Sequence, residues 1–182
     1  MPKKRKLEEE FFESNELEIL NSSSPPMRVI SLFGDLDEEH IQDVCNSLLY
    51  LNHTRHDPLP QESIDLITKP IEFYISTWGG DALGMFAIYD LMRMIRNECP
   101  IHTFAIGKVM SAGVLLLAAG TKGERKIGRN TRIMLHSVRG SHMGNIHLLE
   151  NEMNETRWIQ NQHIEALVKE TRLTKKKLNT ML

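Results

Sequence analysis

Several features are scarce in this sequence, and each scarcity excludes a class of protein. The 182 residues include only two cysteines, Cys45 and Cys99, and they lack the C-x-x-C spacing that metal and redox sites use. The longest apolar run, VLLLAA, is far shorter than the roughly 18 residues that span a bilayer, and the N-terminus lacks the apolar region of a secretory signal. We therefore expect two reduced core thiols in a soluble, cytoplasmic protein.

Excess charge is scarce as well. The 22 lysines and arginines nearly balance the 24 aspartates and glutamates, which leaves a net charge of -2 and no electrostatic reason to expect binding to nucleic acid or a membrane. The hydrophobic content of 41% and the charged content of 25% are those of an ordinary globular protein. We expect no metal and no other cofactor, and the composition by itself leaves the function open.

What is present is a regular alternation of apolar runs and helical patterns. The loop signal NSSSPP separates a flexible, polar N-terminal segment, residues 1–26, from one folded domain, residues 27–182. Apolar runs predict strands at residues 27–34, 70–76, 101–107 and 131–136. Helical periodicity predicts helices at residues 38–51, 82–97 and 146–170, with others starting near residues 111 and 174. Strands that alternate with helices predict an α/β fold with mostly parallel pairing.

Two of these helices carry a definite inward face in the sequence pattern. The predicted inward residues are Ile41, Val44, Cys45, Leu48 and Leu49 in the first helix, and Leu83, Phe86, Ala87, Tyr89, Met94 and Ile95 in the second.

Candidate functional residues stand at the ends of three of the strands: the pair Gly79 and Gly80 and then Ser111 follow two of them, and His136 ends the third. Because the carboxyl ends of parallel strands meet at one edge of a sheet, we expect these three turns to be close in space. Each has a structural explanation as well. The glycines suit a tight turn, Ser111 suits a helix N-cap, and His136 suits a histidine bonded to the backbone.

The catalytic explanation joins the three. A serine hydroxyl is inert at neutral pH without a base within hydrogen-bonding reach, and histidine is the side chain whose pKa suits that task. A helix start beside Ser111 and a bare glycine turn would supply N–H donors to a developing oxyanion. Of the other seven histidines only His102 shares a strand setting, and it stands at the beginning of its strand.

Two long segments, ISTWGGDALGMFAIYDLM and GKVMSAGVLLLAAGTKGERKIGRNTRIMLH, resemble the ClpP family, the serine peptidase subunits of the Clp protease. The likeness runs from about Val29 to the end of the chain. It implies that Ser111 is the nucleophile, that His136 is the base, and that the N–H groups of Gly80 and Ala112 form the oxyanion hole. It also implies a crotonase-like fold of ββα units and hydrolysis of unfolded proteins or peptides.

The resemblance further implies an assembly of identical subunits. Heptameric rings would stack as a tetradecamer, with the helix at residues 146–170 as the handle between the rings. An AAA+ unfoldase would deliver substrate through an axial pore lined by the N-terminal segment.

The sequence departs from the family pattern in several places. The segment at residues 97–100 has about two extra residues and the loop at residues 52–69 is longer than usual, and two further departures concern the site. Trp78 stands where the family has a proline in its S-P-G-G turn, which is expected to alter the substrate-binding edge. The aspartate that completes the family's triad is expected about three residues beyond Leu182, and the last strand and helix of the family are absent from this sequence. A catalytically inactive subunit of a mixed ring is therefore the alternative to a peptidase. Acyl-CoA chemistry on a crotonase-like scaffold would leave Ser111 and His136 unexplained.

Overall fold

The computed structural model describes residues 27–56 and 69–182. The N-terminal segment expected at residues 1–26 and most of the loop before the second strand lie outside the described residues. The strands are β1 (Val29–Phe33), β2 (Ile71–Thr77), β3 (Ile101–Met110), β4 (Arg125–Ile127) and β5 (Arg132–Met134). The helices are α2 (Glu38–His53), α3 (Ala82–Ile95), α4 (Ala112–Ala118), α5 (Ile146–Glu170) and α6 (Lys175–Met181), with a 3₁₀ turn, η1 (Thr54–His56).

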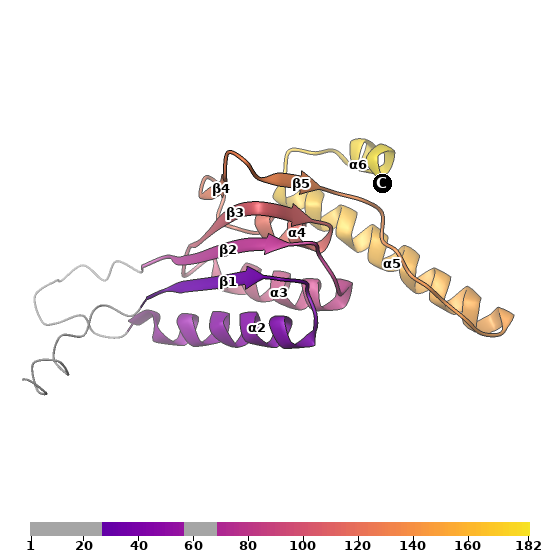
Figure 1. Cartoon of the computed structure of the whole chain (residues 1–182), viewed down its shortest axis with the longest axis horizontal. Coiled ribbons are helices and arrows are strands. Elements are labelled where there is room, and N and C mark those ends of the chain that lie inside the picture. Colours follow the sequence, from indigo (N-terminus) through magenta and orange to yellow (C-terminus); the bar gives the residue numbers. More distant parts are fainter. Residues whose placement is uncertain (1–26, 57–68) are drawn as a thin grey trace, which may run out of the picture. The chain divides into compact units, whose positions relative to one another are not determined.

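The strands form one parallel sheet in the order β1-β2-β3-β4, and β5 also pairs with β3 (Figure 1). The first half of β3 pairs with β4, whereas its last three residues pair with β5. β3 is thus three residues longer than the sequence pattern predicts, because its last three residues pair with a second strand, β5. The predicted α/β fold with parallel pairing is confirmed.

Side-chain caps explain where the main helices begin. The carboxylate of Asp37 accepts the N–H of His40 at the start of α2, and that of Asp81 accepts the N–H of Gly84 at the start of α3. The amide oxygen of Asn145 does the same for α5 by accepting the N–H of Leu148. Such caps satisfy backbone donors that have no partner inside the helix. The described helices include none that is both long enough and apolar enough to cross a membrane.

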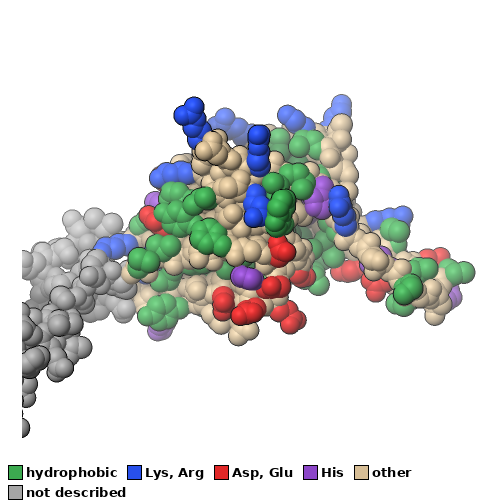
Figure 2. Space-filling view, viewed as in Figure 1, with side chains coloured by type: hydrophobic (Ala, Val, Ile, Leu, Met, Phe, Trp, Pro, Cys, Tyr) green, Lys and Arg blue, Asp and Glu red, His purple; other side chains and the backbone are tan. Residues whose placement is uncertain are grey.

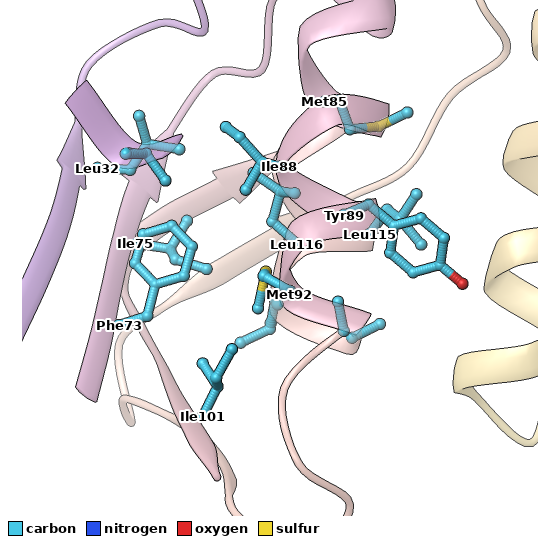
Figure 3. Close-up of a cluster of buried hydrophobic side chains, with 14 of the residues drawn as sticks. Leu32, Phe73, Ile75, Met85, Ile88, Tyr89, Met92, Ile101, Leu115 and Leu116 are labelled. Atoms are coloured by element: carbon cyan, nitrogen blue, oxygen red, sulfur yellow. The ribbon is translucent and has the colours of Figure 1, made fainter. Parts of the chain in front are cut away.

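The hydrophobic core lies between one face of the sheet and the helices. Alternate residues of the strands, such as Leu32, Phe73 and Ile75, are fully buried against Met85 and Ile88 of α3 (Figure 3). Full burial of a side chain of this size contributes about 2 kcal/mol. The core therefore fixes the position of α3, whose first turn enters the site described below.

Four residues predicted to face inward prove to be exposed. Leu83 and Met94 of α3 are 56% and 71% exposed, and Ala87 of α3 and Leu49 of α2 are exposed too. The face of α3 that meets the core carries the predicted Tyr89 and Ile95 together with Met85, Ile88 and Met92. The helix is apolar on more than one side, so hydrophobicity alone could not select the buried face.

The other face of the sheet is not covered by helices among the described residues. Register places Ser31, Tyr74, Phe104 and Lys126 side by side across four strands. The rings of Tyr74 and Phe104 stack with centroids 4.6 Å apart, and the Lys126 ammonium lies 5.1 Å from the Phe104 centroid. Figure 2 shows hydrophobic side chains exposed on the side of the molecule that carries the strands.

Candidate active site

A pocket of about 460 Å³ lies where the carboxyl ends of the strands meet the starts of α3 and α4. Its lining includes Gly80, Ser111, Ala112 and His136, which are the four residues singled out in the sequence, and α5 closes it with Ile159 and His163. The three turns expected to be close in space therefore line one pocket.

Ser111 occupies the sharp turn between β3 and α4. Its φ of 52° makes it the one non-glycine residue with a positive φ in the described part of the chain, a conformation that costs on the order of 1–3 kcal/mol. It stands at the N-cap position, as expected, but its side chain makes no capping hydrogen bond. Its backbone N–H donates to the carbonyl of Met134 at 2.8 Å, which ties the turn to β5. The hydroxyl is consequently not used to cap the helix.

The glycine pair brings a second turn against this serine. A β-carbon on Gly79 would lie 2.6 Å from that of Ser111, so the approach requires glycine. The Leu36 N–H donates to the Gly79 carbonyl and the Asp81 N–H donates to the Leu36 carbonyl, both at 2.8 Å. Gly80 stands between Gly79 and Asp81, the two residues that bond to Leu36. In a parallel bridge of this kind, the N–H of that middle residue points away from Leu36. Gly80 lines the pocket.

Ala112 supplies a second backbone donor at the pocket. It is the first residue of α4, and the first four N–H groups of a helix have no partner inside the helix. Two N–H groups from separate turns therefore belong to residues of the pocket wall, a pattern that suits the stabilisation of a negatively charged oxygen.

His136 follows β5 by two residues and is half-buried at the pocket. Its Nδ1 lies 2.6 Å from the carbonyl oxygen of Ser137. Because a carbonyl can only accept, Nδ1 carries the proton, which leaves Nε2 as the basic nitrogen. In the described part of the chain no hydrogen bond joins His136 to Ser111; such bonds are often long without substrate and tighten when it binds.

The loop that carries His136 is attached to α5. The Val138 N–H donates to the side-chain oxygen of Gln160 at 2.7 Å, so the position of the imidazole depends on the long helix as well as on β5.

Trp78, the residue that departs from the family pattern, is largely exposed at the pocket, and the Lys108 ammonium lies 5.0 Å from its ring centroid. The described residues contain no cluster of His, Cys, Asp or Glu arranged to hold a metal ion.

His163 is a pocket residue that the sequence analysis did not single out. It projects from α5, is only 4% exposed, and lines the pocket together with Ser111 and His136. Burial, and secondarily the charge of His136, lowers the pKa of His163 to about 4. The spacing of Ile159, His163 and Ala166 along one helix face was the signal that could have marked it as inward-facing.

Comparison with protein families assigns the chain to a family. The chain matches the model of the Clp protease family over residues 21–182, which includes all the strands and helices described above. The match covers far more than half of the chain. The protein therefore belongs to the Clp protease family, a family of peptidases.

Proposed function

We propose that this chain is a serine endopeptidase subunit of a self-compartmentalising Clp-type protease. The observation that carries the proposal is the convergence, in one pocket, of a strained serine whose hydroxyl caps nothing, a histidine, and residues with free backbone donors. Neither a tight turn nor a helix cap requires that combination. Membership of the Clp protease family supports the same conclusion.

The proposed chemistry gives each of the four residues a role. The Ser111 hydroxyl attacks the peptide carbonyl carbon while Nε2 of His136 takes its proton. The N–H groups of Gly80 and Ala112 donate to the resulting oxyanion, and removal of one such donor typically lowers turnover by about 10²–10³. His136 then returns the proton to the leaving amine. Water hydrolyses the acyl-enzyme by the same steps, with His136 again acting first as base and then as acid.

The orientation of His136 follows from its contact with the Ser137 carbonyl. This bond holds the tautomer that leaves Nε2 basic, which is one of the two tasks of the acid in a serine triad. The other task is to stabilise the imidazolium by a negative charge, which a neutral carbonyl cannot do. In a well-studied serine protease, replacing the acid by its amide lowers turnover by about 10⁴. An aspartate beyond Leu182 would supply that charge.

We further propose that the functional form is two stacked heptameric rings, with α5 as the handle between them, and that an AAA+ unfoldase delivers unfolded protein to the chamber. Family membership supports oligomeric assembly and an unfoldase partner in general. The exposed apolar side chains along the first half of α5 support the handle in particular; they are Ile146, Leu149, Met153 and Trp158.

A catalytically silent subunit of a mixed ring is the second candidate function. The observation that favours it is that, among the described residues, the Nδ1 of His136 is held by a backbone carbonyl and not by a carboxylate. This candidate predicts stable rings that do not cleave a short fluorogenic peptide, even with an unfoldase or an activating ligand present.

Labelling with a fluorophosphonate tests the nucleophile directly. We expect the unmodified protein to be labelled, Ser111→Ala to lose the label completely, and Ser137→Ala to keep it. Ser137 is a suitable control because it is close to His136 but contributes only its backbone carbonyl. Label that persists in Ser111→Ala would eliminate the assignment. Assembled protein that takes no label and cleaves no peptide would establish the silent subunit instead.

A further inference from the structure

The imidazole of His163 has an unmet hydrogen-bonding capacity. Its Nε2 is the one fully buried side-chain nitrogen or oxygen of the described residues that has no hydrogen-bond partner. Leaving a buried polar group unpaired is costly, and each such group in a protein calls for an explanation. The chemistry described above uses His136 and leaves His163 without a task.

The surroundings of His163 are those of a subsite for a side chain. The ring lines the same pocket as Ser111, together with the apolar side chains of Ala82, Met85 and Ile159. A peptide whose carbonyl is attacked by Ser111 must place the adjacent side chain close to that serine. Asp81 and Arg139 line the same pocket, which is therefore apolar only in part. A side chain directed along Ala82, Met85 and Ile159 would have the His163 ring as its polar partner.

The ring is neutral when the protein is at physiological pH. Burial, and secondarily the charge of His136, lowers the pKa of His163 to about 4. A neutral imidazole offers one donor and one acceptor and no net charge. It therefore favours an uncharged polar group over a carboxylate or an ammonium, which would also lose solvation in the apolar part of the pocket.

We propose that His163 is a specificity-determining residue that makes the protease prefer a carboxamide side chain, as in glutamine or asparagine, next to the scissile bond. The inference rests on the proposed function of Ser111. A carboxamide both donates and accepts, so it can pair with Nε2 in either tautomer of the ring. Methionine has nearly the length of glutamine but would leave Nε2 unpaired.

Matched peptide substrates test this preference. We expect kcat/KM for a fluorogenic peptide with glutamine before the scissile bond to exceed that for its methionine counterpart by about 5- to 100-fold, the effect of an unpaired buried polar group. His163→Leu should reverse the order, and His163→Gln should retain a preference for glutamine. His147→Leu is the control, because His147 is on the same helix and its side chain is 95% exposed. Equal ratios in His163→Leu and the unmodified protein would overturn the proposal.

A binding measurement separates this proposal from the assignment of the nucleophile. In Ser111→Ala, the imidazole ¹⁵N resonances of His163 should shift when the glutamine peptide binds, and much less with the methionine peptide. A glutamine peptide that binds without moving these resonances, or that does not bind, contradicts the role of His163. If the resonances move but the unmodified protein cleaves neither peptide, the subsite stands and the proposed peptidase function fails.

Discussion

At the scale of single residues, the candidate site depends on backbone conformations that most side chains avoid. Gly79 has a φ of 99° and lies against Ser111, so an added methyl group would meet both an unfavourable backbone conformation and the Ser111 side chain. We predict that Gly79→Ala destabilises the protein by more than the roughly 1–2 kcal/mol of the backbone effect alone. It should also lower the rate of fluorophosphonate labelling at least about tenfold, because small displacements of a nucleophile are costly.

Gly123→Ala is the matched control for this prediction. Gly123 has nearly the same φ, 96°, but a β-carbon there would meet nothing within 4 Å. Urea unfolding of the two variants gives the backbone effect from Gly123 and the contact with Ser111 from the difference. Equal losses of stability together with unchanged labelling in Gly79→Ala would show that the contact does not position the serine.

At the scale of secondary-structure elements, a buried carboxylate fixes the end of α5. Glu170 is 1% exposed, and both of its oxygens accept from the Arg96 guanidinium at 2.8 and 2.9 Å, while one also accepts from the Tyr89 hydroxyl. The backbone carbonyl of Glu170 accepts from Arg125. These contacts join α5 to α3 and β4, and His163 lies about two turns earlier on the same helix.

We predict that Glu170→Gln lowers the free energy of unfolding at pH 7 by about 3 kcal/mol, because it leaves Arg96, whose side chain is only 17% exposed, without its counter-charge. Burial raises the pKa of Glu170, but the hydrogen bonds and charge of Arg96, together with the Tyr89 hydrogen bond and the charge of Arg93, outweigh it, and the net pKa is lowered. The ionic contribution is therefore present above the carboxylate's unfolded pKa and is lost as the pH falls through the folded pKa. Urea unfolding should show the difference between the two proteins shrinking in acid.

The control for Glu170→Gln is Glu165→Gln. Glu165 is on the same helix, but its side chain is 47% exposed and its partner Lys175 is 3.4 Å away, and exposed pairs of this kind contribute about 0–1 kcal/mol. A loss of similar size in both variants would contradict a special role for the Glu170 contacts.

The elements also show what the sequence could and could not predict. The predicted bounds of α5, residues 146–170, are confirmed, and the structure shows Asn145 capping its first turn. β4 was missed because its three residues, Arg125, Lys126 and Ile127, have no apolar pattern and pair only through tertiary contacts. The convergence of Gly80, Ser111 and His136 followed from the strand-end rule, whereas their catalytic roles stay predictions. The direction of His163 depends on which face of α5 meets the pocket, a tertiary property.

At the scale of the whole molecule, one face of the sheet has no covering layer among the described residues. Parallel sheets are normally covered on both faces, but here exposed apolar side chains such as Phe33 (58%) and Ile106 (45%) lie beside the Tyr74 and Phe104 stack. A patch of this kind is typical of an interface. Family membership indicates oligomeric assembly in general, and this face is a surface that assembly would cover.

We predict that the protein self-associates at micromolar concentration and that Phe33→Ser weakens the association at least about tenfold, since it removes apolar area from an interface without altering the buried core. Sedimentation velocity over a concentration series measures the shift toward smaller species. Met181→Ser is the control, because Met181 is also half-exposed but lies on α6. Thermal unfolding of the dilute proteins should be nearly the same for all three. If the unmodified protein sediments as a monomer at tens of micromolar, or Phe33→Ser associates as strongly as Met181→Ser, the open face is not an interface of this chain with itself.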